Sequence, residues 1–464
     1  MKKIKVKLVG LILLVMLTTV GGFGCKGLSA QEQAATKPVV LEFWTVADDV
    51  AEMQKLVALY KAERPYLTVN FTVVRENEMY QKLINALADD NSPDILSVRN
   101  RSMGAYLNRL APMPSTVSDV TVRTVKKQFS TETQVNMGTI NMLSVDQLDS
   151  EYVQTVKKDA VYGGKIYGLP LSIDTMALYY NKDLLDRARV AQPPTNWTDF
   201  QTAVKKATRY DSTGKLITQA GTAMGLGSNV EGFDDLLYIL FKQSNLSFVD
   251  SSGRAAFNYV SSDRDQISSA MSIINFYSDF ANAGKDTYTW NSSLDSSLNE
   301  FINGRLAFFF GYSYQYSLIT SRAPQLNVKI LPMLQLDSKQ PVNTANYYLQ
   351  TVSKKSNHQS EAWALINFMA DSQATKTYLD ATGRPSALRA FIADQQSKKE
   401  LAPFVSQILV ADNWYRGKSY QTAKSALSYM LDQWPKAPTD DAGKRVKYWQ
   451  DLLNYAAAQV NQSL

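Results

Sequence analysis

The stretch VVLEFWTVADDVAEMQKLVALYKAERPYLTVNFTVV, residues 39–74, decides the fold class. Its first part, 39–46, is rich in apolar residues and predicts a buried strand, whereas 67–74 alternates apolar and polar side chains, the period of a second strand. Between the two strands, four large side chains recur at helical spacing: Met53, Leu56, Val57 and Tyr60. A second helix over about 77–88 then leads into a third short strand in NSPDILSV. This order predicts an α/β fold, with a parallel sheet covered by helices.

The N-terminus has the layout of an export signal. Four lysines among the first seven residues precede an apolar run from Leu8 to Val20, which is too short to span a bilayer as a helix. Cys25, the only cysteine of the chain, follows directly, so no internal disulfide is possible. This arrangement resembles the lipobox of bacterial lipoproteins, which implies removal of residues 1–24 and diacylation of Cys25. An ordinary secretory signal cut nearby, or one left uncut as an anchor, is the alternative.

Charge and length give the class of the mature chain. Removal of residues 1–24 takes away four lysines and no acids, so 49 basic and 43 acidic residues become 45 and 43. Without stripes of lysine and arginine, this balance argues against a nucleic-acid partner. Residues 25–37 are small and polar, which predicts a flexible tether. More than 400 residues remain, enough for two or more cores.

A series of short motifs resembles the family 1 extracellular solute-binding proteins of ABC importers, the class that includes maltose-binding protein. The resemblance covers nearly all of residues 38–390. The motifs occur in the order of that family: LEFWT (41–45), ERPYLTVNF (63–71), NSPDIL (91–96), GGKIYGLP (163–170), ALYYNKDLL (177–185), PPTNWTDF (193–200), FINGRLAFFFGY (301–312), VSKKSNHQSEAWALINFM (352–369) and GRPSAL (383–388).

The resemblance implies two α/β lobes joined by a hinge, with the ligand in the cleft and closure by hinge bending. We expect lobe 1 to comprise 38–165 and about 346–400, and lobe 2 to comprise 166–345 and about 401–464. It further implies a monomeric lipoprotein on the outer face of the cytoplasmic membrane. This protein would capture a carbohydrate and deliver it to the transmembrane subunits of an ABC permease, without a cofactor.

Little in the sequence favours an enzyme. The only histidine, His358, lies in a polar stretch before a predicted helix, and no G-x-S-x-G, P-loop or dinucleotide fingerprint occurs. We therefore expect no catalytic residues and no metal site. A carboxylate-pair glycosidase stays open, because its chemistry needs only two acidic side chains at a suitable separation. A binding protein for a peptide or a polyol also stays open.

Aromatic residues favour a sugar as the ligand. Phe, Trp and Tyr together number 50 of 464 residues, and half of them are tyrosine. A sugar ring stacks its apolar face on an aromatic plane, while its hydroxyls need hydrogen-bond partners such as carboxylates. Asp174 lies four residues after Pro170, where the family brings a ligand contact into the cleft, whereas Tyr179 and Tyr180 are expected to pack behind it. Alternatively, Asp174 only ends a strand.

The other candidate contacts lie at strand ends and in loops. Trp44 closes the first strand, with a core position as its alternative, and Arg99 lies where the third strand ends. Asn229 and Glu231 occupy a glycine-flanked loop, which suits polar contacts with a ligand.

Aromatic candidates follow further along the chain. Trp290 has polar neighbours in TYTWNSS, which predicts a stacking platform. Gly311 lets the backbone turn so that Tyr312 or Tyr314 faces the cleft. Tyr347 offers another aromatic surface, and Arg384, beside a proline, is expected either to contact the ligand or to form an ion pair that closes the lobes.

Overall fold

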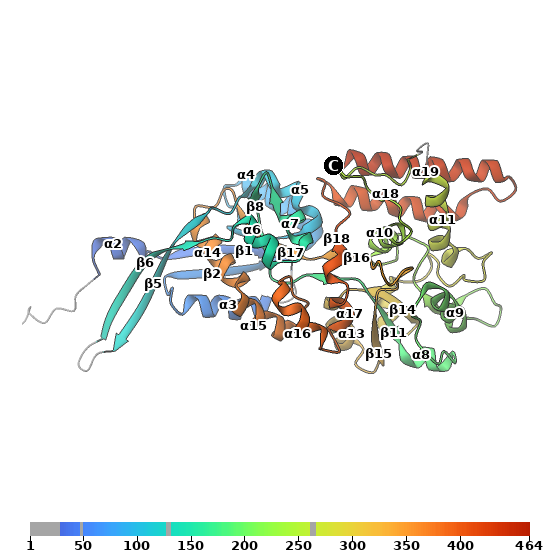
Figure 1. The fold of residues 1–464 in the computed structure, drawn as a ribbon, viewed down its shortest axis with the longest axis horizontal. Coiled ribbons are helices and arrows are strands. Elements are labelled where there is room, and N and C mark those ends of the chain that lie inside the picture. The colour runs from blue at the N-terminus through green and yellow to red at the C-terminus, as the bar shows by residue number, and fades with distance from the viewer. Residues whose placement is uncertain (1–27, 47–49, 127–130, 260–265) are drawn as a thin grey trace, which may run out of the picture.

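The computed structural model describes residues 28–46, 50–126, 131–259 and 266–464, so Cys25 and the expected export signal lie outside the described residues. The described chain forms two lobes, each around its own hydrophobic core (Figure 1). No helix of this described part is long and apolar enough to cross a membrane.

Lobe 1 is built on a mixed sheet in the order β2-β1-β3-β17-β4, with β9 also paired to β17. Its strands are β1 (Val39–Thr45), β2 (Leu67–Val73), β3 (Ile95–Arg99), β4 (Leu110–Ala111), β9 (Leu169–Pro170) and β17 (Tyr348–Ser353). The strands β2, β1 and β3 run parallel, which confirms the predicted parallel sheet at the start of the chain. Strand β17 enters antiparallel between β3 and β4, although it comes from about 250 residues later in the sequence.

Helices cover this sheet because their apolar residues recur at helical spacing. They are α3 (Val50–Lys61), α4 (Glu76–Ala88), α6 (Val145–Glu151), α7 (Gln154–Ala160), α14 (Gln359–Ala370) and α15 (Ser372–Thr382). The four residues expected to face the core from α3 are the four that it buries. Helix α4 matches the helix expected over about 77–88.

A long β-hairpin extends from lobe 1, formed by β5 (Thr116–Lys126) and β6 (Thr131–Asn141) (Figure 1). Its base is fixed to the lobe, because Arg64 forms an ion pair with Asp119 at 2.7 Å and the Tyr66 hydroxyl donates to the Val120 carbonyl at 3.0 Å. Beyond this base the side chains of the hairpin are largely exposed.

The expected flexible tether contains a short helix, α2 (Ala30–Ala35), which corrects the sequence-based expectation. The Ser29 hydroxyl accepts from the Glu32 amide, and the Glu32 carboxylate accepts from the Ser29 amide. This reciprocal capping box satisfies two amides that would otherwise lack partners. Small alanines then favour the helix over an extended chain.

Lobe 2 is built on a second mixed sheet in the order β12-β13-β14-β11-β15. Its strands are β11 (Ala177–Asn181), β12 (Arg209–Tyr210), β13 (Ile217–Thr222), β14 (Leu306–Gly311) and β15 (Val328–Pro332). Its helices are α8 (Lys182–Arg187), α9 (Trp197–Ala207), α10 (Phe233–Gln243), α11 (Gln266–Ser278), α12 (Ser297–Ile302), α13 (Ser313–Arg322), α18 (Tyr420–Gln433) and α19 (Ala442–Gln462). Asn196 caps α9 as predicted, since its side chain accepts from the Asp199 amide at 2.9 Å.

A small hinge sheet joins the lobes, in the order β10 (Asp174–Thr175), β16 (Asn343–Asn346) and β18 (Ala411–Asp412). The first core extends to Ile173 and the second begins at Met176, so the first crossing lies later than the expected break at 165. The reason is that 166–173 includes β9, which pairs with β17 of lobe 1. The last crossing likewise lies near Ala411, later than 400, because Val405, Ile408 and Ala411 still pack in the first core.

Candidate functional site

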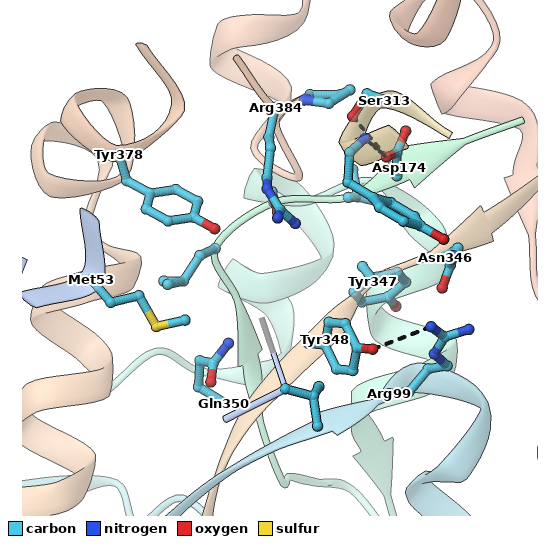
Figure 2. Close-up of a pocket in the computed structure, with 16 residues that line it drawn as sticks. Met53, Arg99, Asp174, Ser313, Asn346, Tyr347, Tyr348, Gln350, Tyr378 and Arg384 are labelled. Carbon is cyan, nitrogen blue, oxygen red and sulfur yellow. Dashed lines mark hydrogen bonds between the residues drawn. The ribbon is translucent and has the colours of Figure 1, made fainter. Parts of the chain in front are cut away.

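A cavity of about 110 Å³ lies between the lobes, beside the hinge sheet. Its walls come from both lobes and from the hinge, and the side chains point toward a common space (Figure 2). The residues that line it are Val46, Met53, Arg99, Leu171, Ser172, Ile173, Asp174, Ser313, Tyr314, Asn346, Tyr347, Tyr348, Gln350, Tyr378, Arg384 and Pro385.

Asp174 begins the hinge strand β10 and is buried at the junction of the lobes. Its carboxylate accepts from the Ser313 hydroxyl at 2.7 Å, from the Tyr314 amide at 3.3 Å and from the Thr175 amide at 2.9 Å. Burial raises the pKa of Asp174 to about 6, although these hydrogen bonds and the charge of Arg384 act in the opposite direction. The group is therefore ionised at neutral pH and can accept a further hydrogen bond.

Aromatic side chains form much of the cavity wall. Tyr314 lies in the first turn of α13 and stacks on Tyr312, with ring centroids 6.1 Å apart and an interplanar angle of 9°. Across the cavity, Tyr348 and Tyr378 present their rings from lobe 1 (Figure 2). Tyr179 lies behind this wall, fully buried, and donates to the Tyr312 carbonyl at 2.6 Å, as expected for a residue that packs behind the site.

Polar groups alternate with these rings. Arg99, at the end of β3, forms an ion pair with Glu76 at 2.8 Å and donates to the Tyr348 hydroxyl at 3.2 Å. Arg384 extends its guanidinium into the cavity from the loop after α15 (Figure 2). Among the described residues, the side-chain amide of Asn346 has no hydrogen-bond partner, and the Gln350 amide is engaged only through its oxygen, which accepts from Ser97 at 2.6 Å. Both amides can bind a polar ligand.

A second, strongly charged pocket adjoins the cavity and shares Arg99, Tyr314 and Asn346 with it. Its other lining residues are Glu76, Arg101, Glu231, Gly232, Asp234, Asp235, Phe310, Tyr312, Gln315, Tyr420 and Lys424. The interlobe space therefore has an aromatic part beside Asp174 and a charged part beside α10.

In this charged pocket a buried ion-pair network crosses from lobe 1 to lobe 2. Arg101 follows β3, and its guanidinium lies 2.5 Å from Asp235 and 3.5 Å from Asp234, at the start of α10. The Tyr420 hydroxyl donates to Asp234 at 2.6 Å. Burial opposes ionisation of Asp234, but Lys424 and Arg101 outweigh it and hold the pKa of this carboxyl below its usual range. Arg101 could not be predicted as part of this network, because an arginine after a strand carries no local signal of burial.

The structure brings together most of the candidate residues. Arg99, Asp174, Tyr314, Tyr347 and Arg384 line the aromatic cavity. Glu231 and Tyr312 line the charged pocket, where the Tyr312 hydroxyl is hydrogen-bonded to Asp235.

The other three candidates lie outside both parts of the interlobe space. Trp290 is fully buried in lobe 2, where it cannot stack on a ligand, and its indole donates to Asn229 at 2.8 Å. Its polar neighbours were misleading, because they bond to nearby loops. Asn229 also donates to the carbonyls of Asn291 and Leu294, so its amide fixes this loop.

Trp44 does not line the interlobe space. It packs in the core of lobe 1, which was the alternative to a ligand contact. The strand β1 is buried from Phe43 to Thr45, where Trp44 lies, although Val40 near its start is exposed. The ring is 9% exposed and lies under the ammonium of Lys82, 4.8 Å from the ring centroid. Val46, just beyond the strand, reaches the cavity in its place.

Several lining residues were not predicted. Met53 was assigned only to the core of α3, and Ser313, Asn346, Gln350 and Tyr378 were not considered. Ser313 could have been found, since it lies in AFFFGYSYQY between the two tyrosines that were chosen. The other four come from a hinge strand, a core strand and two helices. Their sequences have no feature that distinguishes a cavity position from a core position.

The arrangement favours reversible binding of a small polar molecule with an apolar face. Aromatic rings supply flat surfaces, and the carboxylate, amide and guanidinium groups supply directional hydrogen bonds. Asp174 is the one carboxylate among the described residues that line the aromatic cavity. The described residues contain no cluster of three or more metal-binding side chains.

Two relatives are similar to this chain in sequence. The chain is 21% identical over 404 residues to the multiple sugar-binding protein of Streptococcus mutans serotype c (strain ATCC 700610 / UA159), covering 84% of this chain and 85% of that protein. A protein of Brucella abortus (strain 2308) is 26% identical over 147 residues, which are 32% of this chain and 30% of that protein, so the match spans less than a third of this relative.

The fold is also found among solved structures. That of a cyclo/maltodextrin-binding protein complexed with maltotetraose superposes with a TM-score of 0.66 at 15% identity, covering 92% of this chain and 97% of that one.

Residues 55–403 match the model of one protein family, described as bacterial extracellular solute-binding protein. This match covers most of lobe 1 and part of lobe 2, the hinge strands β10 and β16, and all but two of the residues that line the aromatic cavity. The chain therefore belongs to the bacterial extracellular solute-binding protein family.

Proposed function

We propose that this protein is the carbohydrate-binding subunit of an ABC importer, which captures a sugar between its lobes by hinge closure and delivers it to a membrane permease. The observation that carries the proposal is the interlobe cavity, where tyrosine rings from both lobes surround Asp174 and two amides that can accept and donate hydrogen bonds. A pyranose fits such a wall, with its apolar face on a ring and its hydroxyls on the polar groups.

The relatives support the choice of ligand class. One is named a multiple sugar-binding protein, and a solved structure of the same fold contains maltotetraose. A sugar that contacts both lobes stabilises the closed arrangement over the open one, and a permease can distinguish the two. Delivery to a permease and anchoring through Cys25 belong to the proposal as well.

Ligand binding is tested by thermal unfolding and intrinsic fluorescence of the purified protein against maltotetraose, mannobiose, tagatose, amino acids and short peptides. We expect one sugar to raise the unfolding temperature, because a ligand of the folded state alone stabilises it. The shift should be lost in Asp174→Ala and Tyr348→Ala and kept in the control Tyr429→Ala, which changes an exposed tyrosine of α18. A shift with a peptide or with a polyol, and with none of the sugars, would contradict the ligand class.

The glycosidase alternative predicts a different result. A carboxylate-pair mechanism needs two acids that face one bond, whereas the aromatic cavity has Asp174 on its wall and Glu231 lies in the adjoining charged pocket. We expect the sugar that binds to be recovered unchanged after prolonged incubation. Its hydrolysis, with loss of hydrolysis in Asp174→Ala, would establish the enzyme instead.

Anchoring has a separate test. Growth of the producing bacterium with labelled fatty acid should label the wild-type protein, and Cys25→Ala should remain unlabelled. Label that persists in Cys25→Ala would exclude acylation at this cysteine.

A further inference from the structure

We propose that lobe 2 carries a second carbohydrate site, which holds a neutral saccharide unit in a groove between the end of α11 and the α18–α19 connection. The groove has a volume of about 440 Å³. It lies at the end of lobe 2 that is farthest from lobe 1 (Figure 1). It shares no lining residue with the interlobe cavity, so the two sites would bind independently.

Two stacked indoles form one wall of this outer groove. Trp434 and Trp449 have ring centroids 5.2 Å apart and an interplanar angle of 5°. The Trp434 nitrogen donates to the Asn275 side chain at 2.8 Å, and the Trp449 nitrogen donates to the Trp434 carbonyl at 3.1 Å. These bonds fix both rings before any ligand arrives, so little conformational entropy is lost on binding. Trp434 is buried, whereas Trp449 is partly exposed and can contact a sugar.

The opposite wall contains a polar group without a partner. Ser278, the last residue of α11, is 4% exposed, and its hydroxyl makes no hydrogen bond within the described chain. Buried hydroxyls are normally hydrogen-bonded, because an unsatisfied one has lost its bonds to water without a replacement. Ser278 lines the groove, so a ligand hydroxyl there would satisfy it. This orphaned hydroxyl distinguishes a binding site from an ordinary gap between helices.

Two of the three charged side chains that line the groove offset each other. On the α11 side, the Asp279 carboxylate and the Lys285 ammonium form an ion pair at 3.3 Å, so each offsets the charge of the other. On the α19 side, the Arg445 guanidinium lies 6.0 Å from the centroid of the Trp449 ring. Asn275 and Asn282 add neutral amides to the wall. An indole beside hydroxyl and amide groups matches the apolar face and the hydroxyl rim of a sugar ring.

The test uses fluorine NMR of the protein labelled with 5-fluorotryptophan, with the Trp449 signal assigned by Trp449→Phe. Maltotetraose, cellotetraose and mannotetraose are titrated to millimolar concentration, and sorbitol serves as an acyclic control. We expect a saturable shift of the Trp449 signal with at least one tetrasaccharide and none with sorbitol. Asp174→Ala should leave this shift unchanged, which separates the outer groove from the interlobe cavity.

A conservative variant tests the role of the orphaned hydroxyl. Ser278→Ala should weaken binding about fivefold, the effect of one neutral hydrogen bond, without lowering the unfolding temperature. Ser272→Ala is the matched control, because Ser272 lies on the same helix outside the groove and donates to the Ser268 carbonyl. The proposal is overturned if none of the three tetrasaccharides gives a saturable shift, if Ser278→Ala leaves the affinity unchanged, or if Asp174→Ala abolishes the shift.

Discussion

At the scale of single residues, Asp174 combines a cost in stability with a position on the wall of the aromatic cavity. Hydrogen bonds to Ser313 and to Tyr314 hold its carboxylate between the hinge strand and α13, while burial raises its pKa to about 6. In the unfolded chain the pKa of an aspartate is about 3.9. The folded protein therefore binds this proton more tightly than the unfolded chain does.

The first prediction is a pH-dependent stability that Asp174 controls. Its contribution to the free energy of unfolding is largest below about pH 4, falls as the pH rises through about 6, and is constant above that. We therefore expect the unfolding temperature of the wild type, relative to that of Asp174→Asn, to increase when the pH is lowered from about 7.5 to about 5. Asp440→Asn, at an exposed carboxylate, is the control. An unchanged difference between wild type and Asp174→Asn across this range would contradict the raised pKa.

The second prediction concerns the affinity for the ligand. Acidification should weaken this affinity, whereas it raises the stability that Asp174 contributes. A sugar hydroxyl that donates to Asp174 requires the ionised carboxylate, which is lost as the pH falls through about 6. Affinity should then weaken below this pH, by up to about tenfold per pH unit. Titration calorimetry at several pH values measures the effect. An affinity that is the same at acid and neutral pH would mean that Asp174 is not an acceptor for the ligand.

At the scale of elements, the hairpin β5–β6 is nearly independent of the rest of lobe 1. Its base is fixed by the Arg64–Asp119 ion pair, but the side chains toward its tip are largely exposed. As a third prediction, replacement of residues 123–134 by Asn-Gly should change the free energy of unfolding by no more than about 0.5 kcal/mol, as for other surface changes. Ligand affinity should also be retained. Urea unfolding measures the free energy of unfolding, and titration calorimetry measures the ligand affinity. A large loss of stability would show that the distal hairpin supports the lobe.

The elements that could be predicted are those whose pattern is local. The first strands and helices follow from apolar spacing, and the start of α9 follows from Asn196 as its cap. The strand β17 could not be placed, because its position between β3 and β4 depends on pairing with residues far away in the sequence. The helix α2 was missed because a capping box at Ser29 outweighed a composition typical of a tether.

The candidate site was predictable to the extent that its residues lie near motifs. Asp174, Tyr314 and Arg384 each accompany a recognisable stretch, and all three reach the aromatic cavity. Trp290 illustrates the limit, since polar neighbours in sequence say nothing about the side chains that pack on the ring in the folded chain.

At the scale of the whole molecule, the Arg101 network joins the lobes through buried charges. The fourth prediction is that Arg101→Met lowers the free energy of unfolding by about 3–5 kcal/mol, because Asp234 and Asp235 then lose this buried cation. Addition of Asp234→Asn and Asp235→Asn to this variant should restore much of the loss. Arg123→Met is the control, because the Arg123–Glu63 pair is exposed and contributes at most about 1 kcal/mol. A loss equal to that of the control would mean that the network does not hold the lobes together.

The placement of β17 also has a consequence for biosynthesis. A ribosome makes β1, β2 and β3 early, yet the strand that must lie against β3 is completed only at Ser353. Until then the nascent chain has an uncovered strand edge, which is prone to pair with other chains. Every fragment that ends before β17, whether from interrupted translation or from proteolysis, has the same defect. Truncation from the C-terminus should therefore yield aggregates rather than a separately folded lobe 1.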